Sequence, residues 1–423
     1  MPFRFLHTAD LHLDSPLVSL ALRNADLADL VRGASRRALE RIVDIAIAEE
    51  VDALLIAGDL YDGAQSSMST ALFLVSEMRR LESAGIRVFV IRGNHDAQSQ
   101  ITRELTFPPN VHVFDGRGKP LPVGALAGGR EVVLHGISFG QPQAPASLLP
   151  SFRPPVAGAV NIGMLHTSLG GSAGHDNYAP ASVAELVAHG FDYWALGHIH
   201  QRAVHSSGPH VVMPGNPQGR DINEAGAKSA VLVSVDDDGT VTIDERATAT
   251  AIFRRLPVDL GGVGEWEEML ARVRQALAAA SAETGDAQLI ARIELAGQTS
   301  LAWTLRRDED LLLADLQSVA DAVGRCWIEQ VGLSVVPVSD REAGFDALSE
   351  LDRLMEESVL PSHAFETEMR ALAADLLKQL PREARDLLAP DEAAEARLLA
   401  ESAERGRADV LAALMATAGP ETG

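Results

Sequence analysis

Five short polar stretches, each at the end of an apolar run, constrain this chain more than any other feature. The apolar runs are rich in Val, Ile, Leu and Phe, as buried strands are, and they cover residues 3–6, 53–57, 88–91, 160–165 and 193–196. The polar stretches that follow are Asp10-Leu11-His12, Gly58-Asp59-Leu60-Tyr61-Asp62, Gly93-Asn94-His95-Asp96, His166 and Gly197-His198-Ile199-His200. Ligands bind beyond the carboxyl ends of strands in an open α/β sheet, so we predict that these stretches converge.

The side chains of these stretches have the chemistry of a metal site. They offer carboxylates, imidazoles and one carboxamide, and no thiol. Such donors suit borderline or hard divalent ions such as Mn, Fe or Zn. Each residue alone is as readily a solvated loop residue, but the whole set in this order favours metal binding. We therefore predict one site that holds two metal ions.

The order of these motifs also carries a family resemblance. Asp-x-His, Gly-Asp-x-x-Asp, Gly-Asn-His-Asp, a lone His and Gly-His-x-His resemble the motifs of calcineurin-like metallophosphoesterases. The opening segment 5–13 and the segment Pro214-Gly215-Asn216-Pro217-Gln218-Gly219-Arg220 are similar to SbcD-type DNA-repair exonucleases, and most of all to their YhaO-like branch. This resemblance covers residues 1–250 and implies a four-layer α/β/β/α sandwich.

The resemblance also implies a role for each polar residue. The ligands would be Asp10, His12 and His200 for one ion and Asn94, His166 and His198 for the other. Asp59 would bridge both ions, because two dications so close together repel strongly. His95 would lie beside the ions, where an imidazole that titrates near neutrality can stabilise charge at phosphorus or protonate the leaving oxygen.

The sequence leaves the roles of five further residues open. Asp96 either orients His95 or simply forms the loop. Asp62 either lies behind the site or on its phosphate side, or it caps a helix. Gln218 and Arg220 follow a turn shortly after His200, where a guanidinium could grip a phosphate or could merely be exposed. His175 could line a substrate groove.

Hydrophobic periodicity divides the 423 residues into three segments. In residues 1–250, helical patterns over 24–50 and 68–83 alternate with the first apolar runs, which predicts parallel βαβ units. Residues 107–160 are rich in Pro and Gly and predict a second sheet, and residues 229–245 predict a hairpin. Residues 251–345 alternate strand and helix as a small α/β domain. Residues 346–423 predict an acidic helical tail.

The two later segments leave their roles open. The resemblance implies that residues 251–345 form a capping domain that restricts access to the metals, and a domain that only packs is an equal alternative. In the tail, Phe365, Met369, Leu372 and Leu376 form an apolar stripe at helical spacing. This stripe either packs on its own protein or, as the resemblance implies, binds the coiled coil of an SMC-like ATPase.

The composition limits the partners. Acidic residues outnumber basic residues in all three segments, and the formal net charge is −23. Non-specific DNA binding depends on Lys and Arg, so this chain should bind DNA weakly unless a partner supplies basic surface or the substrate is small.

A single cysteine, Cys326, excludes an internal disulfide and fits a reducing compartment, where we expect a buried thiol. The absence of a signal sequence and of long apolar runs predicts a cytoplasmic protein without membrane contact.

Three functions follow, and the first is favoured. The chain is predicted to be a two-metal phosphodiesterase that hydrolyses DNA as an exonuclease or single-strand endonuclease. Manganese is the expected ion, with iron, zinc and magnesium as alternatives. The second function keeps the site and acts on a small nucleotide or phosphoester. The third is a scaffold that recruits a coiled-coil ATPase. Strand polarity and homodimer formation stay open.

Overall fold

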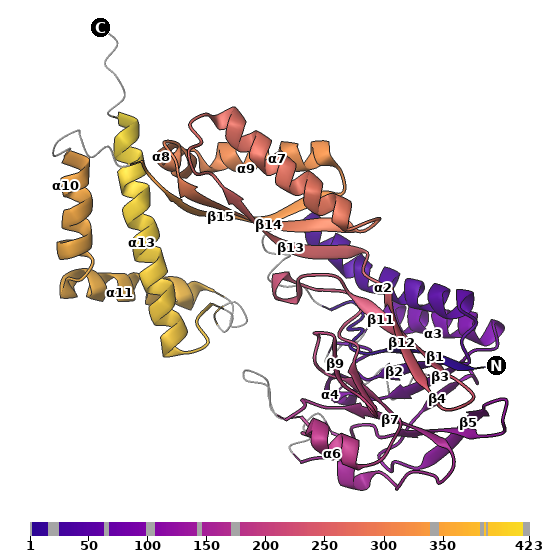
Figure 1. Ribbon diagram of the computed structural model, residues 1–423. Coiled ribbons are helices and arrows are strands. Elements are labelled where there is room, and N and C mark those ends of the chain that lie inside the picture. Colours follow the sequence, from indigo (N-terminus) through magenta and orange to yellow (C-terminus); the bar gives the residue numbers. More distant parts are fainter. Residues whose placement is uncertain are drawn as a thin grey trace. The chain divides into compact units, whose positions relative to one another are not determined.

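The structure is a computed structural model that describes residues 2–15, 25–62, 67–98, 106–141, 146–170, 178–338, 347–380, 385 and 388–417 (Figure 1). It divides into two compact units. The first comprises residues 1–254 and 284–290, and the second comprises residues 255–283 and 291–423. The predicted further division at residue 345 stays a prediction.

Two six-stranded sheets form the first unit. The strands of the first sheet, in spatial order, are β12 (Val241–Ala247), β11 (Ser229–Val235), β1 (Phe3–Thr8), β2 (Ala53–Ala57), β3 (Arg87–Ile91) and β4 (Val111–Val113). Those of the second are β5 (Pro120–Ala125), β6 (Glu131–Gly136), β7 (Val160–His166), β8 (Tyr193–Gly197), β10 (His210–Met213) and β9 (Ala203–Ser207). Strands β1 to β4 pair in parallel, and so do β6, β7, β8 and β10.

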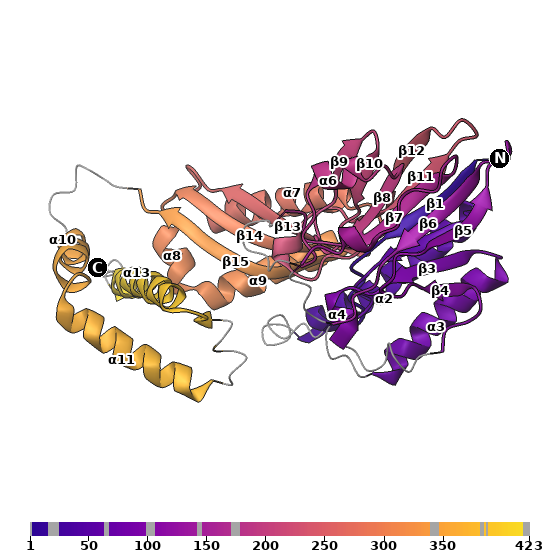
Figure 2. The same ribbon diagram turned by 90° about the horizontal axis from the view of Figure 1, so that it is seen from below.

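Helices cover the outer faces of both sheets (Figure 2). Helices α2 (Ala25–Ala48) and α3 (Met68–Ser83) place Leu39, Ile42 and Leu74 against the apolar side chains of β1, β2 and β3. Helix α6 (Val183–Ala188) places Leu186 on the second sheet with Trp194. The predicted four-layer α/β/β/α architecture is therefore confirmed, and α2 and α3 occupy the segments whose period of 3.6 predicted helices.

The main core lies between the two sheets. Phe5, Leu55 and Phe89 of the first sheet pack in one cluster with side chains of the second, among them Tyr193. A buried imidazole also joins the sheets, because His7 Nδ1 lies 3.0 Å from the Tyr193 hydroxyl and Nε2 lies 3.0 Å from the Leu196 carbonyl oxygen. Burial lowers the pKa of His7 to about 3, so this imidazole is neutral, accepting from Tyr193 and donating to Leu196.

The predicted hairpin over residues 229–245 is present as β11 and β12, which pair antiparallel. Its turn closes with hydrogen bonds from the amide of Asp236 to the carbonyl of Thr240 and from the amide of Gly239 to the carbonyl of Asp236. Strand β11 then pairs antiparallel with β1. The chain thus returns, after building the second sheet, to complete the first.

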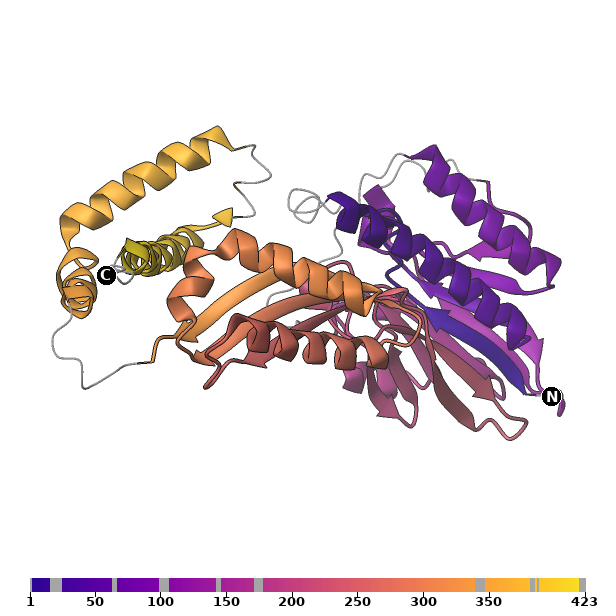
Figure 3. The same ribbon diagram turned by 90° about the horizontal axis from the view of Figure 1, so that it is seen from above.

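The second unit contains a three-stranded sheet in the order β13 (Ala251–Asp259), β14 (Gln288–Gln298) and β15 (Cys326–Val336), of which the first few residues of β13 and β14 belong to the first unit. Helices α7 (Trp266–Glu283) and α9 (Glu309–Val323) lie side by side over one face of it (Figure 3). A short helix, α8 (Ala302–Arg307), precedes α9 and was not predicted. Cys326 is a buried free thiol, as expected.

Helices also form the tail: α10 (Ala347–Leu354), a π-helical turn (Met355–Val359), α11 (His363–Gln379) and α13 (Glu392–Thr417). Helix α13 packs on α8 and buries Leu411 and Ala412. Helix α11 buries none of its residues, and the side chains of Leu372 and Leu376 are 55% and 64% exposed. The apolar stripe is therefore only partly covered within the described chain.

None of the helices in the described parts of the chain is long and apolar enough to cross a membrane.

Candidate metal centre

The predicted ligands lie at the carboxyl ends of neighbouring strands. Asp10 follows β1, Asp59 follows β2, Asn94 begins a short helix after β3, and His166 ends β7. Several of these residues have a left-handed backbone, which is uncommon outside glycine: φ is 54° at Asp10, 41° at His12, 54° at Asp59 and 106° at His198. Such conformations persist only where the surrounding structure enforces them, and they cluster at functional sites.

Two glycines of the motifs let these turns approach closely. A Cβ on Gly93 would meet the Asp59 Oδ1 atom at 2.2 Å, and a Cβ on Gly58 would meet His166 Nδ1 at 2.5 Å. Gly58 also has a φ of 95°. No other residue type fits these positions, which explains why glycine precedes the aspartate and the asparagine in the two motifs.

Asp10, His12 and His200 form the first group of donors, with one donor atom of each within 4.8 Å of the others. His12 Nε2 lies 3.1 Å from His200 Nε2. The Asp10 carboxylate accepts a hydrogen bond from the backbone amide of His198 at 3.0 Å, which holds it at the end of β1.

His166, Asn94 and Asp59 form the second group. The buried His166 Nε2 atom lies 3.0 Å from Asn94 Oδ1 and 3.3 Å from Asp59 Oδ2. Its other nitrogen, Nδ1, lies 2.9 Å from the carbonyl oxygen of Ala57 and carries the proton that this carbonyl accepts. The His198 ring lies beside the group, 5.1 Å from the His166 ring centre. Asp59 adjoins both groups, since its carboxylate also lies with Asp10 and His166.

This donor set fits a pair of divalent cations. The two imidazole nitrogens His12 Nε2 and His200 Nε2 face each other at 3.1 Å, close enough for one divalent cation to bind both. Burial alone lowers the pKa of His166, but the Asp59 and Asp10 carboxylates outweigh burial and raise it to about 9. The carboxylates thus favour a positive charge at this point, as a bound cation would supply. The assignment of individual ligands stays a prediction.

His95 lies beside the donors and has a carboxylate partner. His95 Nδ1 lies 3.1 Å from Asp62 Oδ1, and Asp62 also accepts a hydrogen bond from the Ser15 hydroxyl. The hydrogen bond that His95 donates to Asp62 raises the pKa of His95 above its ordinary value. With Nδ1 bound to Asp62, Nε2 is the nitrogen left for a substrate. Asp62 therefore lies behind His95, one of the positions considered from the sequence.

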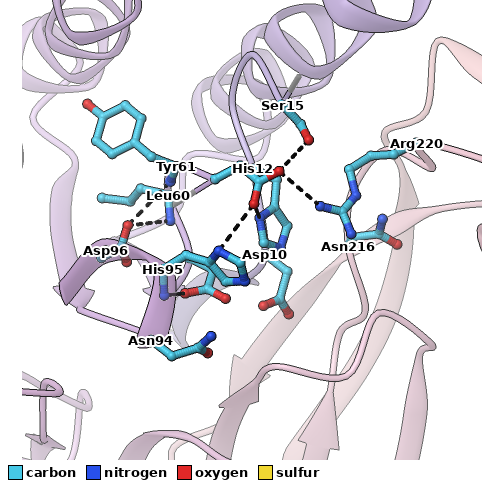
Figure 4. Close-up of polar contacts among 12 residues, drawn as sticks. Asp10, His12, Ser15, Leu60, Tyr61, Asn94, His95, Asp96, Asn216 and Arg220 are labelled. Atoms are coloured by element: carbon cyan, nitrogen blue, oxygen red, sulfur yellow. Dashed lines mark hydrogen bonds and ion pairs between the residues drawn. The ribbon is translucent and has the colours of Figure 1, made fainter. Parts of the chain in front are cut away.

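Asp96 has a different position from the one considered first. Its carboxylate accepts hydrogen bonds from the backbone amides of Leu60 at 2.9 Å and Tyr61 at 3.3 Å (Figure 4). It also accepts one from the backbone amide of Gly93 at 3.1 Å. Burial raises the pKa of Asp96 to about 7. Asp96 thus joins the two loops that follow β2 and β3, and its contacts favour the loop-forming interpretation, while Asp62 contacts His95.

Gln218 does not face the site, which corrects its prediction as a substrate-binding residue. Its side chain is 3% exposed. The amide donates to the carbonyls of Gly219 and Ala251 and accepts from the amides of Thr250 and Ala251. These backbone groups occupy its polar atoms, so Gln218 anchors the start of β13 instead.

A cavity of about 780 Å³ opens beside the donors. Its lining includes Asp59, Asn94, His95, Tyr178, His198, His200, Arg220, Glu224 and Lys228. Arg220 is thus part of the cavity wall, and its role in binding a substrate stays a prediction. Tyr178, Glu224 and Lys228 were not predicted to line the site. For Glu224, the sequence offered only its acidic side chain four positions after Arg220. His175 lies outside the described residues.

Comparisons with known protein families assign two parts of the chain. Residues 3–202 match the family model described as calcineurin-like phosphoesterase, so this part of the chain is a domain of that family of metal-dependent hydrolases, which bind two divalent metals. Residues 253–336 match the model described as metallophosphoesterase YhaO, middle domain. The calcineurin-like class predicted from the motifs is confirmed.

Three individual proteins are similar to this chain. The chain is 36% identical to the metallophosphoesterase YhaO of Bacillus subtilis over 258 residues, which cover 60% of this chain and 63% of that protein. It is 29% identical to the DNA double-strand break repair protein Mre11 of Sulfurisphaera tokodaii, covering 48% of this chain and 50% of that protein. It is 28% identical to the SbcD component of the nuclease SbcCD of Bacillus subtilis, covering 54% of this chain and 66% of that protein. The matches thus span half to two thirds of each relative.

Proposed function

We propose that this protein is a two-metal phosphodiesterase that hydrolyses DNA. The observation that carries the proposal is the position of His95, held by Asp62 at the wall of the cavity. Four of the predicted metal ligands, Asp59, Asn94, His198 and His200, line the same cavity. A site that only stored metal for structural purposes would need neither an additional oriented imidazole nor an open cavity. The similarity to Mre11 and to the SbcD component of SbcCD supports DNA as the substrate.

The residues of the chain divide the reaction between them. Asp10, His12 and His200 would hold one ion and Asn94, His166 and His198 the other, with Asp59 between them. When bound, such a pair supplies a hydroxide nucleophile and neutralises charge on the phosphate. Asp62 holds His95 Nδ1, which leaves the Nε2 proton for the departing sugar oxygen. Arg220 lines the same cavity, with Nη1 3.7 Å from Asp62 Oδ2, and would offer its guanidinium to a phosphate oxygen.

The test is degradation of DNA by the purified chain. Single- and double-stranded DNA labelled at either the 3′ or the 5′ end is incubated with Mn²⁺, Mg²⁺, Zn²⁺ or EDTA. We expect cleavage that requires a divalent ion and stops in EDTA, and the label released first gives the polarity. Manganese is the ion in which we expect the highest rate. Absence of DNA cleavage in every metal would contradict the proposal for the chain alone.

A small phosphoester is the second candidate substrate. The formal charge of −23 opposes DNA binding, whereas the cavity of about 780 Å³ has the size of a small-molecule site. Hydrolysis of bis(p-nitrophenyl) phosphate without any cleavage of DNA would favour this candidate.

The helical tail supports a partner proposal. Leu372 and Leu376 are exposed on α11 and form part of an apolar stripe that suits a helix of another chain. A coiled-coil ATPase bound there would also supply basic surface that this acidic chain lacks. Co-purification of such an ATPase should be lost in a Leu372→Asp, Leu376→Asp double variant, and retention would reject this surface.

A further inference from the structure

The Glu224 carboxylate at the cavity contacts both His200, a predicted metal ligand, and Arg220, a predicted substrate-binding residue. Its side chain is 11% exposed. Oε1 lies 2.6 Å from His200 Nδ1 and accepts from Arg220 Nη2 at 2.8 Å. Oε2 accepts from the Asn216 side-chain amide at 2.8 Å and from the Arg220 backbone amide at 2.8 Å. Both oxygens are therefore fully engaged.

The contact with His200 determines which nitrogen of that ring can bind a cation. Arg220 Nη2 also lies 3.2 Å from His200 Nδ1, but a guanidinium donates and cannot accept. A carboxylate only accepts, so the 2.6 Å contact with Glu224 requires a proton on Nδ1. The lone pair of His200 is then on Nε2, the nitrogen that faces His12 Nε2 at 3.1 Å. A carboxylate behind a histidine in this way fixes the ring and increases its basicity as a ligand.

The segment around Glu224 also anchors the backbone of His200. The carbonyl oxygen of His200 accepts from the Asn216 amide at 3.3 Å and from Lys228 Nζ at 3.3 Å. Glu224 itself ends a short 3₁₀ helix, Ile222–Glu224, which the Asp221 side chain caps through the Asn223 amide. Residues 216–228 thus hold the ring and the main chain of one predicted ligand.

We propose that Glu224 is a positioning residue that orients His200 for one metal ion and Arg220 for the substrate phosphate. This inference rests on the two-metal phosphodiesterase function proposed above. Because the same carboxylate holds both side chains, its neutralisation should weaken one metal site and the grip on the substrate together. A carboxylate that only paired with Arg220 would affect the substrate and leave metal binding unchanged.

The experiment compares Mn²⁺ binding and hydrolysis of bis(p-nitrophenyl) phosphate in the full chain and its variants. We expect Glu224→Gln to weaken one of the two Mn²⁺ sites by about 10- to 100-fold in titration calorimetry, the range found for such partners of metal-bound histidines. The KM should rise as well. The matched control is Glu49→Gln, since Glu49 also binds two arginines, Arg4 at 2.6 Å and Arg246 at 2.8 Å, but does not line the cavity. It should bind Mn²⁺ as the wild type does.

A double-mutant cycle with His200→Ala tests the route of the effect. If Glu224 acts through His200, Glu224→Gln should weaken Mn²⁺ binding no further once the imidazole is gone. Additive effects, or wild-type affinity for both ions in Glu224→Gln, would overturn the inference. If Glu224→Gln does not fold, Glu224→Asp keeps the charge but withdraws it from His200, and the same loss is expected.

The two proposals fail in different ways. A wild type that binds two Mn²⁺ ions, one of them weakened in Glu224→Gln, but cleaves no phosphodiester would reject the function and keep the positioning role. A wild type that binds no divalent ion would overturn both.

Discussion

Asp59→Asn should lower the turnover of bis(p-nitrophenyl) phosphate in Mn²⁺ by more than about 100-fold, the upper end of what loss of a residue behind a ligand costs. The reason is the position of the carboxylate, which lies with Asp10 of the first donor group and His166 of the second, as expected of the predicted bridging ligand. Bound Mn²⁺, measured by elemental analysis after gel filtration, should fall from two ions per chain to one or none.

Loss of the fold should not explain this result. The Asp59 Oδ1 atom accepts a hydrogen bond from the His95 amide at 3.0 Å, and an asparagine oxygen can accept the same bond. The substitution also removes a negative charge next to the buried Asp10. It also weakens the 3.3 Å ion pair between Asp59 and His166, which opposes that gain. In EDTA the variant should therefore still unfold cooperatively, with a thermal midpoint close to that of the wild type. The control is Asp52→Asn at the other end of β2, where the carboxylate accepts from the Arg4 amide. Full activity of Asp59→Asn with wild-type metal content would refute the site.

His95→Gln should separate proton transfer from metal binding. Loss of a general acid costs about 10²- to 10⁴-fold in rate, and we expect a loss of this size for DNA, whose sugar oxygen is a poor leaving group. For bis(p-nitrophenyl) phosphate the loss should be much smaller, because p-nitrophenolate departs without a proton. Asp62→Asn should lower the two rates as His95→Gln does, with the larger loss for DNA, since Asp62 holds His95 Nδ1.

The metal content of His95→Gln distinguishes a general acid from a metal ligand at this position. His95, His12 and Asp62 also form a group whose donor atoms lie within 4.8 Å of one another, and this group could itself hold a cation. Unchanged Mn²⁺ content in His95→Gln would exclude that alternative, whereas loss of an ion together with equal losses on both substrates would reject the general acid. His205→Gln, on the exposed edge strand β9, is the control for replacement of a histidine.

Much of the fold could be predicted because its signals are local. Helices α2 and α3 bury one side each, so their apolar residues recur with the helical period. Strands β2, β7 and β8 are buried along their whole length and appear as continuous apolar runs. The short helix α8 escaped prediction because it is only six residues long, too short for a period to be recognised.

The sequence by itself determined the residue types at the strand ends, and with them the class of the site. A parallel sheet brings its strand ends to one edge, so Asp10, Asp59 and Asn94 could be grouped before any coordinates were known. His166 ends a strand of the second sheet, and the packing of the two sheets brings it to the same site. The sequence also showed the glycines before Asp59 and Asn94, which are required because the close approach of the turns leaves no room for a side chain.

Only the tertiary structure decided which polar side chains meet. Asp96 is next to His95 in the sequence but binds backbone amides of the loop that follows β2. Asp62, from that same loop, contacts the imidazole instead. Gln218 and Glu224 lie six positions apart, and one anchors β13 while the other holds His200. Hydrogen bonds act over about 3 Å and depend on direction, so partners from distant segments are set by packing and leave no periodic trace in the sequence.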